Sequence, residues 1–186
     1  MKVAFDEIRR QASRALSAAG VAPGLEEECG WACAWLQAAG YDGVKMLVEA
    51  LETTPRENRR PSLAMEYGIV NLDNGSCVFA APQVVDVAAS EGRVFLANVR
   101  HGLYVLPFAV RANLAIGCPV DPSFAVGGER KADPYAEKIR AAVDAGIEVA
   151  DADWSALLAR AKEALVPETA ESLLRGAGAG TVIEAD

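Results

Sequence analysis

The 186-residue chain contains one histidine, His101, and this scarcity excludes several kinds of site. None of its four cysteines, Cys29, Cys33, Cys77 and Cys118, pairs at Cys-x-x-Cys spacing, so the usual zinc ligand set is missing. Cys29 and Cys33 are four residues apart and would share one helix face as small core residues. We therefore expect no bound metal.

The chain also lacks long apolar runs and an excess of positive charge. No stretch approaches the ~18 apolar residues of a membrane-spanning helix, and residues 1–10 lack the apolar segment of a signal peptide. The formal net charge is −8, whereas nucleic acids and anionic membranes attract clustered lysine and arginine. These features predict a cytoplasmic protein with neither nucleic acid nor membrane as a partner.

One basic segment, PRENRRPS at 55–62, stands out from this acidic background. Glu57 interrupts the run and a proline lies near each end, which is typical of a solvated loop. A phosphate-binding site is the alternative interpretation.

The sequence is rich in apolar residues, which make up 52% of the chain and include many alanines. Aromatic residues make up only 6% of the chain. Apolar residues recur at spacings of three and four, which predicts helices at 5–19, 25–39 and 43–52. Asp42 is expected to cap the third helix.

Beyond residue 62, short apolar runs alternate with turn residues. Asp73, Asn74 and Gly75 predict a tight hairpin, because Asn-Gly favours positive φ at both central positions of the turn. Segment 82–90 fits a strand or a helix. Further strands are expected at 93–99, 115–120 and 147–150, and further helices at 106–114, 134–145 and 153–165.

These elements predict an α+β fold, in which an N-terminal helical segment of about three helices packs with a mixed β-sheet flanked by helices. We expect a single domain over 1–186. It would comprise a helical subregion at 1–53, an α/β subregion at 62–175 and a flexible tail at 176–186.

Trp31 and Trp35 lie four residues apart on the second predicted helix, offset from its apolar stripe. This helix is therefore apolar around most of its circumference and must be covered on several sides. The rings fit either the core of their own chain or a subunit contact, where tryptophan is enriched. We expect a homodimer that uses this patch.

His101 follows a predicted strand and precedes a predicted helix, a position that often borders a site. Histidine acts as an acid or base near neutral pH, so His101 is the one catalytic candidate. The alternative is a loop histidine at the surface of a turn, dispensable for folding, because the sequence shows no nucleophile and acid beside it.

Two further motifs have a structural and a functional interpretation. Glu148, Asp151 and Asp153 could hold a magnesium ion, or could cap and complement the start of the last predicted helix. The glycines of GAGAG at 176–180 resemble a phosphate loop, but no helix follows them as the dinucleotide fingerprint requires.

Three segments together resemble a family of short bacterial proteins of unknown function. They are LPFAVRANL at 106–114, VPETAESLLRGAGAG at 166–180 and the helical opening at 5–40. This resemblance implies no activity.

Residues 4–52 also resemble the N-terminal helices of the malate/L-lactate dehydrogenases that lack a Rossmann fold. In that family a glycine-aspartate phrase precedes Ser-His-Gly, whose histidine is catalytic. Here GYDGVKM at 40–46 has Val44, Lys45 and Met46 at that place.

Two functions follow. The first is non-catalytic binding of a small molecule or a partner protein, without a cofactor. The second, implied by the dehydrogenase resemblance, is an oxidoreductase that uses a nicotinamide cofactor, with His101 as acid or base.

Overall fold

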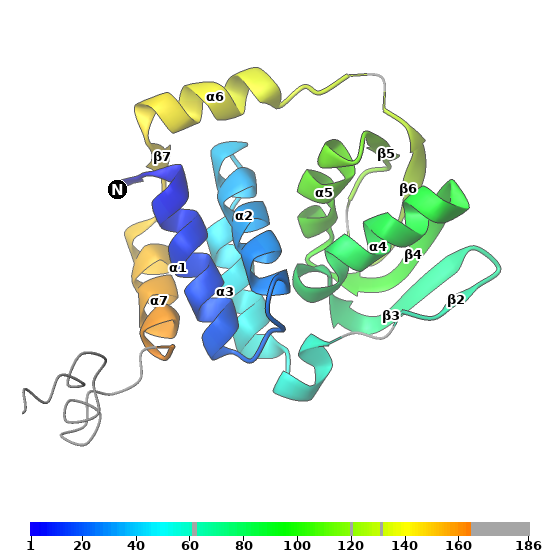
Figure 1. Ribbon diagram of the computed structural model, residues 1–186, viewed down its shortest axis with the longest axis horizontal. Coiled ribbons are helices and arrows are strands. Elements are labelled where there is room, and N and C mark those ends of the chain that lie inside the picture. The colour runs from blue at the N-terminus through cyan, green and yellow to red at the C-terminus, as the bar shows by residue number, and fades with distance from the viewer. Residues whose placement is uncertain (61–62, 120, 131, 165–186) are drawn as a thin grey trace, which may run out of the picture.

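The computed structural model describes residues 1–60, 63–119, 121–130 and 132–164, and its fold is α+β, as predicted (Figure 1). A helical bundle occupies one side of the molecule and a mixed sheet the other. Two helices lie between these layers. The tail predicted at 176–186 falls outside the described residues.

The bundle uses both ends of the chain. Its members are α1 (Phe5–Ala18), α2 (Leu25–Ala38), α3 (Gly43–Thr53) and α7 (Asp151–Lys162). Helix α1 packs on α2 and α7, and β1 (Lys2–Val3) pairs antiparallel with β7 (Ile147–Glu148). Cys29 and Cys33 are fully buried, which confirms that both belong to the core.

The five-stranded sheet has the order β2-β3-β4-β6-β5. Only β3 and β4 are parallel, because α4 crosses over between them. The strands are β2 (Met65–Glu66), β3 (Ile69–Ser76), β4 (Arg93–Arg100), β5 (Leu114–Ile116) and β6 (Phe124–Glu129).

Helices α4 (Cys77–Glu91) and α5 (Val105–Arg111) contact the sheet on one side and α2 on the other (Figure 1). A helix between two layers must be apolar around most of its circumference, which explains the run from Cys77 to Ala81. Tyr104, fully buried, joins the layers by donating to the Gly43 carbonyl at 3.3 Å.

The hairpin predicted at Asp73-Asn74-Gly75 is wrong. Asp73 and Asn74 do have positive φ, but they form an irregularity inside β3, and the chain then enters α4. Chain reversal occurs at Tyr67-Gly68, between β2 and β3. Tertiary burial decides the outcome, because residues 77–81 fill the space between the bundle and the sheet.

Several boundaries also differ from those predicted. Segment 82–90 is helical, and β6 lies in a region where no strand was expected. Asp42 makes no side-chain capping bond to α3; the Gln37 side chain accepts from the Val44 N–H instead, at 3.1 Å. Helix α6 (Ala136–Ala145) begins two residues later than expected and connects the two layers.

Of the two interpretations of the tryptophans, the structure agrees with packing in the core of their own chain. Trp35 is buried, with its ring centroid 5.0 Å from that of Tyr135. Trp31 is half-buried and meets Phe108 edge-on at 5.8 Å, with the Arg111 guanidinium 4.7 Å above its ring. Both rings therefore pack within their own chain, and they no longer support a subunit contact.

None of the described helices is both long enough and apolar enough to cross a membrane.

Candidate functional site

His101 occupies a sharp corner at the end of β4. Its backbone is left-handed, with φ 57° and ψ 41°, and the 3-10 helix η2 (Gly102–Tyr104) begins at the next residue. A left-handed backbone is uncommon for a residue with a side chain, so the corner must be held by its surroundings. Asp121 holds it: its two carboxylate oxygens accept the N–H groups of His101 and Gly102 at 2.9 and 2.8 Å.

Glycine is required after the histidine because of close packing. A Cβ atom at Gly102 would lie 2.6 Å from the Phe124 ring and 2.9 Å from Asp121 Oδ1. The missing side chain is therefore what lets the Asp121 carboxylate reach both backbone N–H groups.

The His101 imidazole is oriented by Ser76, the last residue of β3. The Ser76 hydroxyl lies 2.9 Å from His101 Nδ1 and already accepts the Val78 N–H at 3.2 Å, as the N-cap of α4. Among the described residues, Nδ1 is the acceptor available to the hydroxyl hydrogen. We infer that the hydroxyl donates to Nδ1, since its hydrogen has no other described acceptor, and that tautomer places the ring proton on Nε2.

The electrostatic environment favours this neutral form. Burial, followed by the nearby Arg100 charge, lowers the pKa of His101 below its ordinary value, and Asp121 opposes this only in part. At neutral pH His101 is thus a neutral imidazole that presents an N–H donor.

Two adjoining cavities open beside this corner, and we call them together the cleft. The first, of about 400 Å³, is lined by His101, Gly102, Asp121, Met46, Leu103 and Pro119. The second, of about 490 Å³, shares Leu103 and Pro119 with the first and extends toward Tyr135 and Arg130. The walls come from both layers of the fold, which is a common place for a ligand site.

The second cavity is mostly apolar, with a few polar groups at its far end. Tyr41 and Tyr135 share a hydrogen bond at 3.2 Å between their hydroxyls. Burial and this hydrogen bond raise the pKa of Tyr135 to about 12, so it stays protonated. Arg130 lines the same cavity, and its Nε donates to the Leu114 carbonyl at 3.3 Å.

The Ser76–His101 pair differs from a hydrolytic triad in two respects. Ser76 is only 3% exposed and lies outside the cleft lining, so its hydroxyl is withdrawn from a substrate there. Asp121 binds the backbone N–H of His101, whereas a triad carboxylate binds the imidazole. The arrangement can donate a hydrogen bond, or exchange a proton at Nε2, but it lacks an available serine nucleophile.

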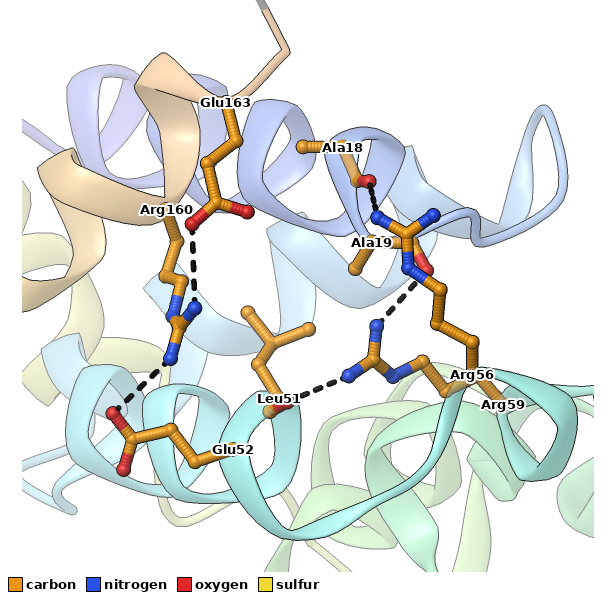
Figure 2. Close-up of polar contacts among 8 residues, drawn as sticks. All are labelled: Ala18, Ala19, Leu51, Glu52, Arg56, Arg59, Arg160 and Glu163. Carbon is orange, nitrogen blue, oxygen red and sulfur yellow. Dashed lines mark hydrogen bonds and ion pairs between the residues drawn. The ribbon is translucent and has the colours of Figure 1, made fainter.

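In the basic segment at 55–60, a single residue, Arg59, is buried, while the others are exposed as in a solvated segment. Arg59, only 8% exposed, donates to the carbonyls of Ala19 and Leu51 at 3.0 and 2.6 Å (Figure 2). It also donates to the Thr54 carbonyl at 3.0 Å. These carbonyls lie at the C-terminal ends of α1 and α3, where a positive charge is favourable and an anion is not. Arg59 therefore joins two helix ends.

The acidic residues considered from sequence for a magnesium ion do not form a metal site among the described residues. Asp151 and Asp153 lie in the first turn of α7, whose N-cap is Ala150 and which has no side-chain cap. Among the residues that the structure describes, no three histidine, cysteine or acidic side chains converge on a metal position. The sequence pointed to His101 but missed Asp121 and Arg130, which line the cleft, and Ser76, which contacts His101 from behind the lining.

A family model described as "Protein of unknown function (DUF3726)" matches residues 3–78. No curated protein matches the chain. Solved structures that resemble it include malate dehydrogenase from Entamoeba histolytica, with 17% sequence identity and a TM-score of 0.44. That alignment covers 62% of this chain and 37% of the enzyme, so the chain spans well under half of the enzyme's length. The chain is thus similar over residues 3–78 to a family of unknown function and has a weak structural likeness to a malate dehydrogenase.

Proposed function

We propose that this protein binds a small organic molecule in the cleft beside His101, without chemical conversion. The observation that carries the proposal is the His101 imidazole at the cleft wall, whose Nδ1 is engaged by Ser76, so that Nε2 is the ring nitrogen left for a ligand. Ligand pockets are typically apolar with a few fixed polar groups. Leu103, Pro119 and the Asp121-held corner supply this combination.

The lone histidine permits a direct test. In a ¹H–¹³C spectrum the imidazole of His101 gives one set of signals, which needs no assignment by mutation. Pooled small carbonyl and carboxyl compounds should include members that shift these signals and raise Tm, since binding to the folded state stabilises it. A His101→Gln variant should keep its fold and bind those compounds more weakly. If no pool moves the His101 signals, the proposal fails.

A second candidate is an oxidoreductase with His101 as acid or base. Met46, from the segment where the malate/L-lactate dehydrogenases carry Ser-His-Gly, lines the same cavity as His101, and this favours the candidate. The fit to a nicotinamide dinucleotide is poor, because among the described lining residues Arg130 is the one cation for a diphosphate. Melting with saturating NADH or NADPH separates the two functions. At 100 times Kd, binding would add about 2.7 kcal/mol.

We also propose that the protein is a cytoplasmic homodimer. Since both tryptophans are packed internally, the contact would use another surface, such as the outer sheet face, where Ile69 and Phe95 are paired in register and exposed. Sedimentation at micromolar concentration tests this, and a single species near 19.6 kDa would rule the dimer out.

A further inference from the structure

We infer that the ligand is an amphipathic carboxylate whose anionic group lies on Arg130 and whose apolar body extends along the cleft toward His101. This inference rests on the proposed function and adds to it the chemical class of the ligand and its direction in the cleft.

The polar groups that the cleft leaves available are mainly donors. His101 presents Nε2–H, and Asp121 already accepts two backbone N–H groups. The Tyr41 and Tyr135 hydroxyls share one hydrogen bond, which uses the hydrogen of one of them. The other hydroxyl hydrogen has no acceptor among the described residues. These donors are half-buried, so a ligand that displaces water from them must supply acceptors, and one that brings oxygen atoms is favoured over an amine.

Charge decides which end of the cleft takes an anion. Asp121 places a carboxylate next to His101, and a second negative charge there would be repelled. At the other end, Arg130 uses Nε for the Leu114 carbonyl, and its terminal nitrogens make no hydrogen bond to a described residue. The ion pairs formed within the described residues use other arginines, namely Arg9, Arg10, Arg111 and Arg160. A guanidinium binds a carboxylate through paired N–H groups.

The wall between these ends is apolar. Leu103 and Pro119 form the boundary of the two cavities, and Leu106, Ile116 and Pro134 continue it toward Arg130. A hydrocarbon or aromatic body fits this stretch, since burying apolar surface is favourable. A short, fully polar acid would leave it in contact with water.

Octanoate, octan-1-ol and octylammonium are matched probes, because they share one hydrocarbon chain and differ in the head group. We expect octanoate to bind at least about tenfold more tightly than octan-1-ol, and octylammonium not to bind detectably. Calorimetry measures the affinities, and the His101 signals report whether the ligand reaches the first cavity. Equal affinity for octanoate and octan-1-ol would overturn the assignment of the anion.

The variants locate the charge. Arg130→Gln should lower octanoate affinity about tenfold and leave octan-1-ol unchanged, and Arg130→Lys should retain part of the preference. Arg140→Gln removes the same charge from an exposed position outside the lining and serves as the control. An octanoate preference that survives Arg130→Gln would contradict the inference.

The two proposals fail in different ways. If octan-1-ol binds as well as octanoate while the His101 signals still shift, the carboxylate assignment is wrong and the binding function stands. If octanoate binds through Arg130 and the His101 signals stay fixed, the function proposed at His101 is wrong. The preference for octanoate in the wild-type protein is a test that does not depend on any variant folding.

Discussion

The arginine at the helix ends and the histidine corner use polar side chains in opposite ways. Arg59 directs its side-chain N–H groups at three backbone carbonyls of its own chain, two of which are drawn in Figure 2, and these bonds give it a structural role. At the corner, Asp121 and Ser76 supply the holding bonds, and the Nε2 side of His101 remains available. A charged residue in a basic segment can thus be structural, whereas a neutral histidine can be the group available to a ligand.

Removing Arg59 should give the largest loss of stability. Arg59→Ala would leave three buried or half-buried carbonyls without their donor, and we expect the free energy of unfolding to fall by about 3–5 kcal/mol. Urea unfolding measures this.

Arg60→Ala is the matched control from the same segment. Arg60 is exposed, and its hydrogen bond to the Gly20 carbonyl is long, at 3.5 Å. Its loss should therefore change stability by less than about 0.5 kcal/mol. Equal effects of the two substitutions would show that Arg59 is not the structural residue described here.

Sequence reasoning predicted the α+β class and the N-terminal helices, because their apolar periodicity reflects burial directly. It failed where long-range packing overrides local preference, as in the Asp73-Asn74-Gly75 segment, which has the expected positive φ but no reversal. Of the site, it identified His101 alone. Ser76 and Asp121 reach His101 across 25 and 20 residues, and no local pattern encodes that contact.

A substitution at Gly102 should have an intermediate effect and should act on the corner alone. Gly102→Ala would force the Phe124 ring and Asp121 apart, which we expect to cost about 1–3 kcal/mol. Gly117→Ala, whose Cβ would lie 3.4 Å from its nearest neighbours, is the mild comparison. Thermal unfolding of both variants measures the difference, and a Gly102→Ala protein as stable as the wild type would refute the tight corner.

The smallest effect concerns pH. Because burial lowers the pKa of His101 in the folded state, the unfolded chain takes up a proton more readily near the ordinary histidine value of about 6.5. The contribution of His101 to the free energy of unfolding is therefore present in full above that value. It is lost progressively as the pH falls below that value. Between pH 7.5 and 5.5, wild-type stability should fall more than that of His101→Gln. If the stabilities of the wild type and of His101→Gln change in parallel with pH, the pKa of His101 is not lowered in the folded state.

The central claim is that His101 is a neutral donor held by Ser76, and its ¹⁵N chemical shifts test this most directly. At pH 7 we predict an unprotonated Nδ1, a protonated Nε2 and a titration midpoint below the ordinary histidine value. Ser76→Ala should remove the tautomer preference, while the fold, judged by circular dichroism, stays intact. A ring protonated on Nδ1, or a charged ring at pH 7, would contradict the account.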